Sequence, residues 1–298
     1  MVKWTGLPYA ESTYECERDL IINDIDYKEQ LKSFLQRKEK PPKADMRKHL
    51  AQGESEFRML YKVFGDRSNI NEEAKEKAVE DYKKQLQETV YKNGGQLRDY
   101  QAEGVAWMLS NYVNKRSSVL ADEMGLGKTL QTAAFASLLA TKMNVPGPIL
   151  IIAPLSTLAH WYREFQSWTD LNVIVYHGSS DDRDIIRQYE FAYECDRPKY
   201  PVGFTQTYLK RCVPKKAAKT DSPWMVQVVI TTPETLVAED YNELTAISWE
   251  LLVVDEAHRL KNHTSKLTLT LRDDKFTFKH KLLLLLANSV APSLRCKR

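Results

Sequence analysis

The sequence predicts an α/β fold with a doubly wound, mainly parallel sheet, and two observations carry that prediction. The first is a set of near-continuous apolar runs, which suit strands that helices cover on both faces of a sheet. The second is that stretches with helical periodicity separate the runs, as crossover helices separate parallel strands. The runs lie at residues 118–121, 149–153, 173–176, 226–231 and 251–254.

Composition is that of an ordinary globular protein and excludes several classes. The 298 residues include 43 Lys and Arg against 40 Asp and Glu, and the net charge of +3 excludes a uniformly basic coat for nucleic acid. The longest apolar run, Leu282 to Ala287, is far shorter than the about 18 residues that a membrane-spanning helix needs, so no membrane partner is expected. The 4 cysteines match no zinc spacing and indicate reduced thiols in the cytosol or nucleus.

The chain before residue 94 divides into two stretches. In residues 1–40, Val2 and Trp4 alternate with polar neighbours as in a short strand, and a helix is expected over residues 25–38. Residues 41–93 have the composition of a linker with one helix. An i, i+4 apolar stripe predicts that helix and consists of Ala74, Ala78, Tyr82, Leu86 and Val90.

A glycine-containing turn joins the first apolar run to a helix. Residues 122–129 read DEMGLGKT and precede the helix-forming LQTAAFASLLA. Successive N–H groups in such a turn cradle phosphates, which Lys128 would neutralise, while the Thr129 hydroxyl would bind Mg²⁺. Asp122 stands where the strict phosphate-loop pattern has its first glycine, and an ordinary glycine turn is the alternative. The match rests on Gly125, Gly127, Lys128 and Thr129.

Two adjacent carboxylates follow the last apolar run. Asp255 and Glu256 come directly after residues 251–254, at the carboxyl edge where open α/β sheets bind ligands. Since the phosphate loop lies at the same edge, we expect Asp255 to hold Mg²⁺ and Glu256 to act as general base on the attacking water. His258 is expected to link this site to a polymer-binding site. Outside this context, such a pair would be a solvated surface pair.

Five sequence blocks together resemble the Swi/Snf-like chromatin-remodelling ATPases of helicase superfamily 2. The blocks are QLRDYQAEGVAWM (96–108), DEMGLGKT (122–129), ILIIAPLSTLAHWYREFQSW (149–168), ITTPETL (230–236) and DEAHRLKN (255–262). The resemblance implies a RecA-like helicase lobe 1, the ATP-binding lobe, over residues 94–286, with an insertion at about 193–225.

The resemblance also implies ATP and Mg²⁺ as cofactors. Gln101 would contact adenine, Glu256, Lys128 and Asp255 would carry the catalysis, and Thr129 and Asp255 would hold the metal. The implied nucleotide-binding set is Gln101, Asp122, Glu123, Met124, Gly125, Leu126, Gly127, Lys128 and Thr129.

DNA is the implied polymer. Ser156, Thr157 and Thr232 are candidate contacts to the DNA backbone, which fix register without reading sequence. Taken singly, each of the three is better explained as a turn or cap residue. Residues 199–219 are basic and carry no acid, so they either add phosphate contacts or form a solvated loop.

The N-terminal block VKWTGLPYAESTYE (2–15) and the helix after it resemble the later part of a chromodomain, a small β-sheet plus helix, over residues 1–40. A chromodomain directly before this ATPase is the arrangement of the chromodomain–helicase–DNA-binding class. Chromodomains grip methyl-lysine in an aromatic cage. Trp4 matches one cage position and Tyr14 stands where the family has tryptophan, but a third aromatic has no counterpart. We therefore expect Trp4 to serve packing, and contact with histone tails stays open.

Towards the C-terminus the resemblance ends. In the family, the strand that starts at KHKLLL (279–284) leads to a Thr-Gly-Thr-Pro motif and a second lobe with arginine fingers, whereas residues 287–298 form a divergent tail. Such fingers contribute roughly 10³–10⁵ in rate, so this chain alone is expected to bind ATP-Mg²⁺ weakly and to turn over little.

The expected function is the ATP-binding motor lobe of an ATP-dependent chromatin remodeller, a DNA-dependent ATP hydrolase located in the nucleus. In the intact family, ATP hydrolysis is coupled to translocation on nucleosomal DNA. Two alternatives stay open. One is a hydrolysis-deficient fragment that binds nucleotide or tethers chromatin, and the other, disfavoured by the DEMGLGKT and RLKN blocks, is a DEAH-type RNA helicase.

Overall fold

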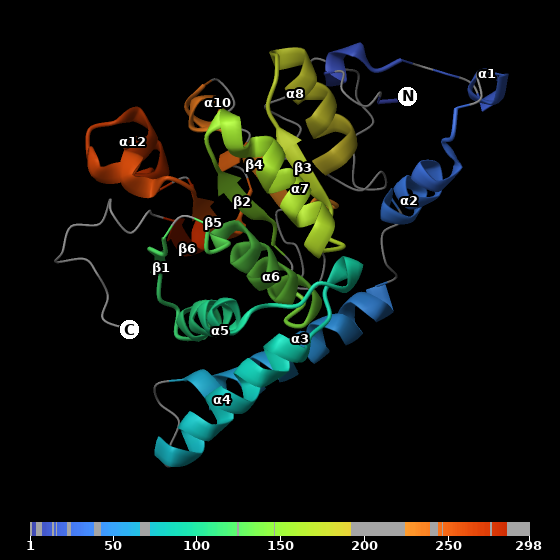
Figure 1. The fold of residues 1–298 in the computed structure, drawn as a ribbon. Coiled ribbons are helices and arrows are strands. Elements are labelled where there is room, and N and C mark those ends of the chain that lie inside the picture. The colour runs from blue at the N-terminus through green and yellow to red at the C-terminus, as the bar shows by residue number, and fades with distance from the viewer. Residues whose placement is uncertain are drawn as a thin grey trace.

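A computed structural model of the chain shows a six-stranded sheet with helices on both faces (Figure 1). The structure describes residues 2–3, 8–13, 15, 17–22, 25–38, 43–65, 72–123, 125–145, 147–191, 224–238, 244–245, 247–274 and 276–284. All strand pairings are parallel, so the predicted α/β fold with a parallel sheet is confirmed. Among these residues, no helix has the length and apolarity that crossing a bilayer requires.

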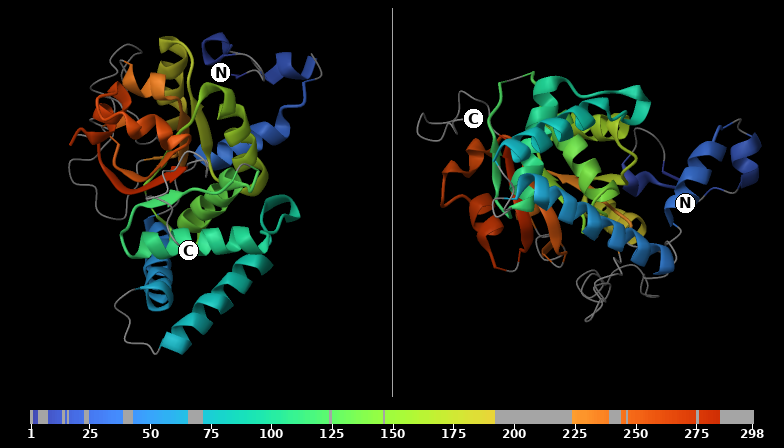
Figure 2. Two further views of the ribbon diagram at one scale, coloured as in Figure 1. Left: turned by 60° about the vertical axis from the view of Figure 1, so that its left-hand side comes forward. Right: turned by 90° about the horizontal axis from the view of Figure 1, so that it is seen from below.

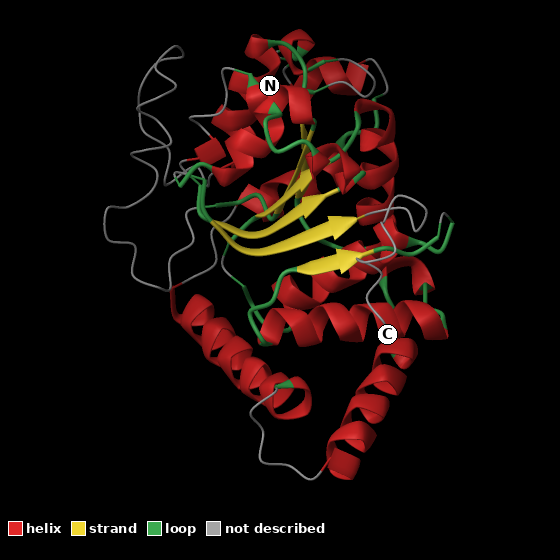
Figure 3. Cartoon of the chain, turned by 90° about the vertical axis from the view of Figure 1, so that its left-hand side faces the viewer, coloured by secondary structure: helices red, strands yellow, loops and turns green. Residues whose placement is uncertain are grey.

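The strands follow the apolar runs of the sequence. In sheet order they are β1 (Ser118–Leu120), β6 (Phe278–Leu284), β5 (Trp249–Val254), β2 (Ile149–Ile152), β4 (Val228–Thr231) and β3 (Val173–Tyr176). The central strands β5 and β2 are buried along their whole length. In Figure 3 the arrows run in one direction between two layers of helices, so the carboxyl ends of all strands meet at one edge.

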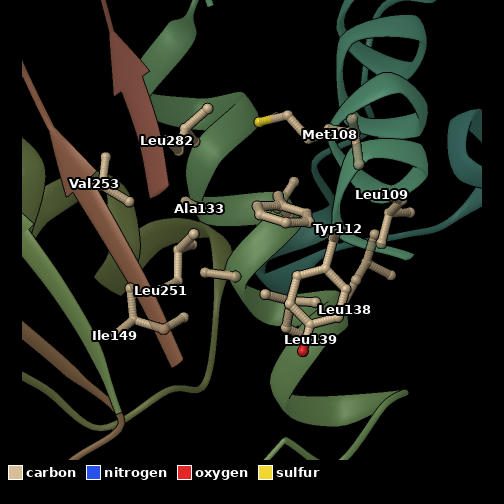
Figure 4. Close-up of a cluster of buried hydrophobic side chains, with 14 of the residues drawn as sticks. Met108, Leu109, Tyr112, Ala133, Leu138, Leu139, Ile149, Leu251, Val253 and Leu282 are labelled. Atoms are coloured by element: carbon tan, nitrogen blue, oxygen red, sulfur yellow. The ribbon is translucent and has the colours of Figure 1, made fainter. Parts of the chain in front are cut away.

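One face of the sheet is covered by α5 (Asp99–Val113), α6 (Lys128–Thr141) and α7 (Leu158–Trp168). Their apolar sides and the facing strand residues form one hydrophobic core. Figure 4 shows its centre, where Tyr112 of α5 and Leu139 of α6 lie among side chains of the sheet. Burial of these residues from both layers is the main source of favourable free energy for the fold.

The opposite face is covered by α8 (Ser180–Ile186), α10 (Pro233–Val237) and α12 (Lys266–Arg272), which form a second core. Alternation along β5 feeds both cores: Leu251 and Val253 join the first, and Leu252 and Val254 the second. This two-sided burial explains why the strand is apolar at every one of these positions.

The described part of residues 41–93 holds two α-helices where one was predicted. α3 (Lys43–Phe64) and α4 (Glu72–Glu88) lie beside α5, on its side away from the sheet (Figures 1 and 2). Of the predicted stripe, Tyr82 and Leu86 are buried in the first core, whereas Val90 follows the helix and is exposed. The helix that was not predicted is α3, because its apolar side can be recognised only from its packing against α5.

The β-sheet expected in the N-terminal forty residues is absent from the described part of that stretch. It contains a single antiparallel bridge, between Val2 and Thr13, with backbone hydrogen bonds of 2.7 and 3.1 Å. The rest is helical: a 3₁₀ turn (Tyr9–Glu11), α1 (Glu17–Ile22) and α2 (Lys28–Lys38). The expectation of a small sheet was wrong here because one bridge leaves no ladder on which a strand can extend.

The N-terminal stretch instead packs against α8. Ala10 N donates a 2.6 Å hydrogen bond to Asp182 Oδ1, and the same carboxylate accepts from the hydroxyl and N–H of Ser179 at the start of α8. Burial would raise the pKa of Asp182, but these hydrogen bonds outweigh it and hold the pKa below its ordinary value. Asp182 therefore joins two segments that are distant in the sequence.

A second buried carboxylate, Glu250, lies at the amino-terminal end of β5, opposite the edge where the strands end. Its side chain accepts hydrogen bonds from Tyr112 Oη at 2.7 Å and from Lys279 Nζ at 2.6 Å. The ring of His280 lies against that of Tyr112, with centroids 4.2 Å apart. These contacts join α5, β5 and β6 near the amino-terminal end of β5.

Removing the tyrosine hydroxyl should destabilise the fold. In Tyr112→Phe, the buried Glu250 loses one of its two donors, and we expect the free energy of unfolding to fall by about 1–3 kcal/mol. Denaturant unfolding followed by circular dichroism measures this. Tyr100→Phe, on the same helix, is the matched control and should change little. Equal stability of the two variants would contradict the structural role of the pair.

Acidification should weaken the fold through His280. Burial lowers the pKa of His280, the charge of Glu250 raises it, and Lys279 and Lys115 lower it further, so the net shift is downward from 6.5. Below about pH 6.5 the unfolded chain therefore takes up a proton more readily than the folded chain, and stability falls as the pH decreases. Thermal unfolding on both sides of that pH should show a smaller loss in His280→Gln than in the wild type; an identical loss would refute this.

Candidate functional site

The phosphate-loop candidate and the carboxylate pair meet at the carboxyl edge of the sheet. β1 leads into residues 122–127 and then α6, while β5 ends directly before Asp255. β6 lies between these two strands, so they are second neighbours in the sheet. The sequence predicted this meeting, and the strand order provides it.

The loop before α6 has the backbone of an anion-binding turn. Gly125 and Gly127 have φ values of 86° and 75°, which other residues rarely adopt. A Cβ at Gly127 would also lie only 2.7 Å from the Gln101 side-chain nitrogen. Because α6 begins at Lys128, the N–H groups of its first turn have no acceptor within the helix and are available to an anion.

The Lys128 side chain folds back and hydrogen-bonds to the loop that precedes it. Its ammonium donates to the carbonyl oxygens of Asp122 at 2.8 Å and Glu123 at 2.9 Å. Burial lowers the pKa of Lys128 from its ordinary value, and the charges of Asp122, Asp255 and Glu256 partly oppose that shift. Because the charges of Asp255 and Glu256 act on this ammonium, the phosphate-loop candidate and the carboxylate pair form parts of one site.

Two glutamines hold the loop from behind. Gln101 Nε2 lies 3.5 Å from the carbonyl oxygen of Leu126, and Gln131 Nε2 donates to the same oxygen at 3.2 Å. Gln131 is fully buried and also reaches the Asp122 carboxylate at 3.4 Å. Gln131 was not predicted; a long amide side chain on the buried side of an α6 rich in Ala and Leu is the signal that marks it.

Glu256 has a strained backbone. Its φ of 51° and ψ of 45° are left-handed, which costs a non-glycine residue of order 1–3 kcal/mol and is common at functional sites. His258 Nδ1 lies 3.0 Å from Glu256 Oε2. This contact is an ion pair when the imidazole is protonated, although Oε2 accepts no hydrogen bond from the described part of the chain. A carboxylate oxygen that accepts no hydrogen bond is suited to receive a proton from a bound water.

Asp255 is held by a residue that sequence reasoning missed. Trp161 Nε1 of α7 donates a 2.9 Å hydrogen bond to Asp255 Oδ2, and the N–H of Glu256 donates to Oδ1 at 2.9 Å. Trp161 lies in the block 149–168, but nothing in that block connects it with the carboxylates. The contact depends on how α7 packs over the sheet.

The three hydroxyl residues proposed for DNA differ in exposure. Ser156 is exposed, and Thr157 is half-buried with its hydroxyl donating to the carbonyl of Pro154 at 2.9 Å. Thr232 is buried and caps α10 by accepting from the N–H of Thr235 at 3.2 Å. As the structure has them, Ser156 is open to a partner and the other two hydroxyls serve local turns.

Several predicted residues lie outside the described part of the chain. These are Met124 of the loop, the aromatic residues Trp4 and Tyr14, the basic residues 199–219 and the C-terminal residues 287–298. The remaining members of the predicted nucleotide set are all described, and they surround the start of α6.

The residues at this edge fit a nucleoside triphosphate with Mg²⁺. Mg²⁺ in such sites is typically held by one or two protein oxygen ligands together with substrate phosphates. The Asp255 carboxylate, whose two anchoring hydrogen bonds leave lone pairs free, and the Thr129 hydroxyl at the start of α6 would supply these ligands. The N–H groups at the start of α6 and Lys128 would supply the phosphate contacts.

Comparison with known proteins agrees with this geometry. Residues 100–285 match the SNF2-related domain family. The chain belongs to this family. The matched SNF2-related residues contain the phosphate loop, the carboxylate pair and all six strands.

The relatives of this SNF2-related chain extend the match toward its N-terminus. Chromodomain-helicase-DNA-binding protein 9 of Homo sapiens is 38% identical over 288 residues, which are 95% of this chain and 8% of the relative. Chromodomain-helicase-DNA-binding protein 8 of Danio rerio is 37% identical over 284 residues, 95% of this chain and 9% of the relative. The resemblance to the chromodomain–helicase–DNA-binding class is thus confirmed, and the chain spans less than a tenth of these relatives.

A solved structure was also found to be similar. It is the Sulfolobus solfataricus SWI2/SNF2 ATPase core in complex with dsDNA, with 24% identity and a TM-score of 0.48. The match covers 70% of this chain and 35% of that chain.

Proposed function

We propose that the chain binds ATP with Mg²⁺ and hydrolyses it as part of a DNA-stimulated, chromatin-remodelling ATPase of the nucleus. The single observation that carries the proposal is the convergence on one edge of the sheet. There the charges of Asp122, Asp255 and Glu256 raise the pKa of the Lys128 ammonium against the effect of burial. The same ammonium lies beside a glycine-containing loop and the N-terminus of α6. The three carboxylates exceed the one ammonium in charge and would attract a divalent cation, while the ammonium and the N–H groups of the helix start would hold the triphosphate.

Each residue has one role in the proposed reaction. Lys128 leaves its two loop carbonyls and neutralises the terminal phosphates, while the N–H groups of the first turn of α6 hold their oxygens. Thr129 and Asp255 hold Mg²⁺, which supplies charge neutralisation to the transferring phosphoryl group. Glu256 orients the attacking water and takes its proton on Oε2, which accepts no hydrogen bond among the described residues and lies beside His258. Gln101, which touches the loop at Leu126, contacts the adenine.

DNA is the proposed polymer partner, and nucleosomes are its proposed context. Ser156 is the candidate hydroxyl that faces outward, and with Thr157 it lies on the loop between β2 and α7. Thr232, as a cap, would act through the backbone of its turn rather than through its hydroxyl. The names of the relatives, which include helicase and DNA-binding, support this partner.

For the N-terminal forty residues we propose an origin in a chromodomain and a packing role. The match to the relatives covers 95% of the chain and therefore extends beyond residues 100–285. The hydrogen bonds from Ala10 to Asp182 and from Arg37 Nη1 to Asn172 Oδ1, at 3.1 Å, support attachment of this stretch to the lobe.

Nucleotide binding and turnover of the purified chain test the proposal. A fluorescent ATP analogue should bind, and bind more tightly with Mg²⁺ than with EDTA. Phosphate release by this chain should be slow, and, measured with protein in excess of ATP, it should rise with duplex DNA and not with RNA. Binding without any release would favour the nucleotide-binding alternative, RNA stimulation would favour an RNA helicase, and no binding would refute the site.

A further inference from the structure

The carboxylate of Asp255 is fixed by two donors from different elements. Glu256 N donates to Oδ1 and Trp161 Nε1 donates to Oδ2, each at 2.9 Å, and the N–H of Asp255 itself bonds to the carbonyl oxygen of Ile152 at 2.8 Å. The terminal torsion of an aspartate is soft, and one hydrogen bond restrains it weakly. Donors on both oxygens hold the carboxylate plane in one orientation.

The tryptophan that supplies one of these donors is itself immobile. Trp161 is 1% exposed and lies in the first core, with its ring 6.3 Å from that of Phe165 at an angle of 28°. Its indole N–H therefore reaches the charged carboxylate from a dry, packed position. Hydrogen bonds to ionised groups in such surroundings are stronger than those between neutral groups.

We infer that Trp161 is a positioning residue that orients the Asp255 carboxylate for Mg²⁺, beyond its part in the core. A carboxylate has about four lone-pair positions, and the two donors leave about two for the metal or its water. Mg²⁺ demands near-ideal octahedral geometry, so its affinity is sensitive to rotation of a ligand. This inference rests on the proposed nucleotide site.

The structure offers a matched control for the packing role of tryptophan. Trp249, at the start of β5, is also fully buried, and its Nε1 donates a 2.9 Å hydrogen bond to the backbone carbonyl of Leu244. Trp249 belongs to the second core, on the other face of the sheet. Trp249→Phe thus makes the same chemical change as Trp161→Phe without touching Asp255.

The test is a Mg²⁺ titration of the full chain with mant-AMPPNP, a fluorescent analogue that is not hydrolysed. Trp161→Phe should raise the Mg²⁺ concentration at half-saturation by about 10–100-fold, the usual cost of losing a hydrogen-bond partner behind a metal ligand. Its affinity for the analogue in EDTA should stay that of the wild type. Trp249→Phe should leave both quantities unchanged, even where it lowers the melting temperature.

Replacement of Trp161 by 3-benzothienylalanine gives a second, isosteric test in case the smaller phenyl ring prevents folding. Sulfur there takes the place of the indole N–H and keeps the ring size, so the same rise in the Mg²⁺ midpoint is expected. A wild-type midpoint in this variant, or in a folded Trp161→Phe, would overturn the inference. A wild-type chain that gains nothing from Mg²⁺ would instead overturn the proposed nucleotide site, and this inference with it.

Discussion

Lys128→Ala should lose most of the nucleotide affinity of the chain. The ammonium lies between the carbonyl oxygens of Asp122 and Glu123, and the charges of Asp255 and Glu256 act on it. Without it the phosphates would meet carboxylates with no side-chain cation between them. Hydrogen bonds to charged groups contribute about 1.5–3 kcal/mol. We therefore expect the dissociation constant for the nucleotide to rise by about 10- to 150-fold.

Titration with the fluorescent ATP analogue measures the effect. Lys142→Ala removes the same charge at the other end of α6 and is the matched control, since its position is far along the helix from the loop. Its affinity should equal that of the wild type. Equal losses in the two variants would show that net charge, and not the site, determines binding.

Glu256→Gln should separate binding from hydrolysis. The amide keeps the shape of the side chain and the left-handed backbone but cannot take a proton, and general bases typically contribute 10²–10⁴-fold to rate. We therefore expect the rate of single-turnover phosphate release to fall by about 10²–10⁴-fold, with nucleotide affinity retained. Rapid mixing with radiolabelled ATP measures both quantities in one experiment.

Glu234→Gln is the control for this variant. Glu234 belongs to the ITTPETL block and is exposed. Its Oε1 lies 3.7 Å from Arg259 Nη1. Surface pairs of this kind contribute about 0–1 kcal/mol, so its loss should leave release nearly unchanged. A Glu256→Gln chain that hydrolyses at the wild-type rate would remove Glu256 from the role of base.

Much of the site followed from local sequence. The glycines at 125 and 127, Lys128 and the Asp-Glu pair after an apolar strand each carry their chemistry in residue type and spacing, and the fold brings them to one edge. Trp161 did not follow, because it reaches Asp255 from a different element. Gln131 did not follow, because its hydrogen bonds to Leu126 and Asp122 depend on how the loop folds back onto α6. A buried polar side chain declares itself only when its surroundings are known.

The same division holds for the fold. The apolar runs were predicted as strands and are strands, since burial on both faces demands apolar residues at every position. The helix α3 and the absence of a small sheet from the described N-terminal residues were not predicted, because both depend on partners, α5 and α8, that lie far away in the sequence.

The sequence by itself determined the class of fold, the family and the chemistry of the phosphate loop and carboxylates. These are properties of short segments, in which periodicity and residue type act locally. Only the tertiary structure decided that Trp161 anchors Asp255, that the Thr232 side chain is buried and that Glu250 is satisfied by Tyr112 and Lys279. The physical reason is that hydrogen bonds and burial depend on distances between elements, which packing alone fixes.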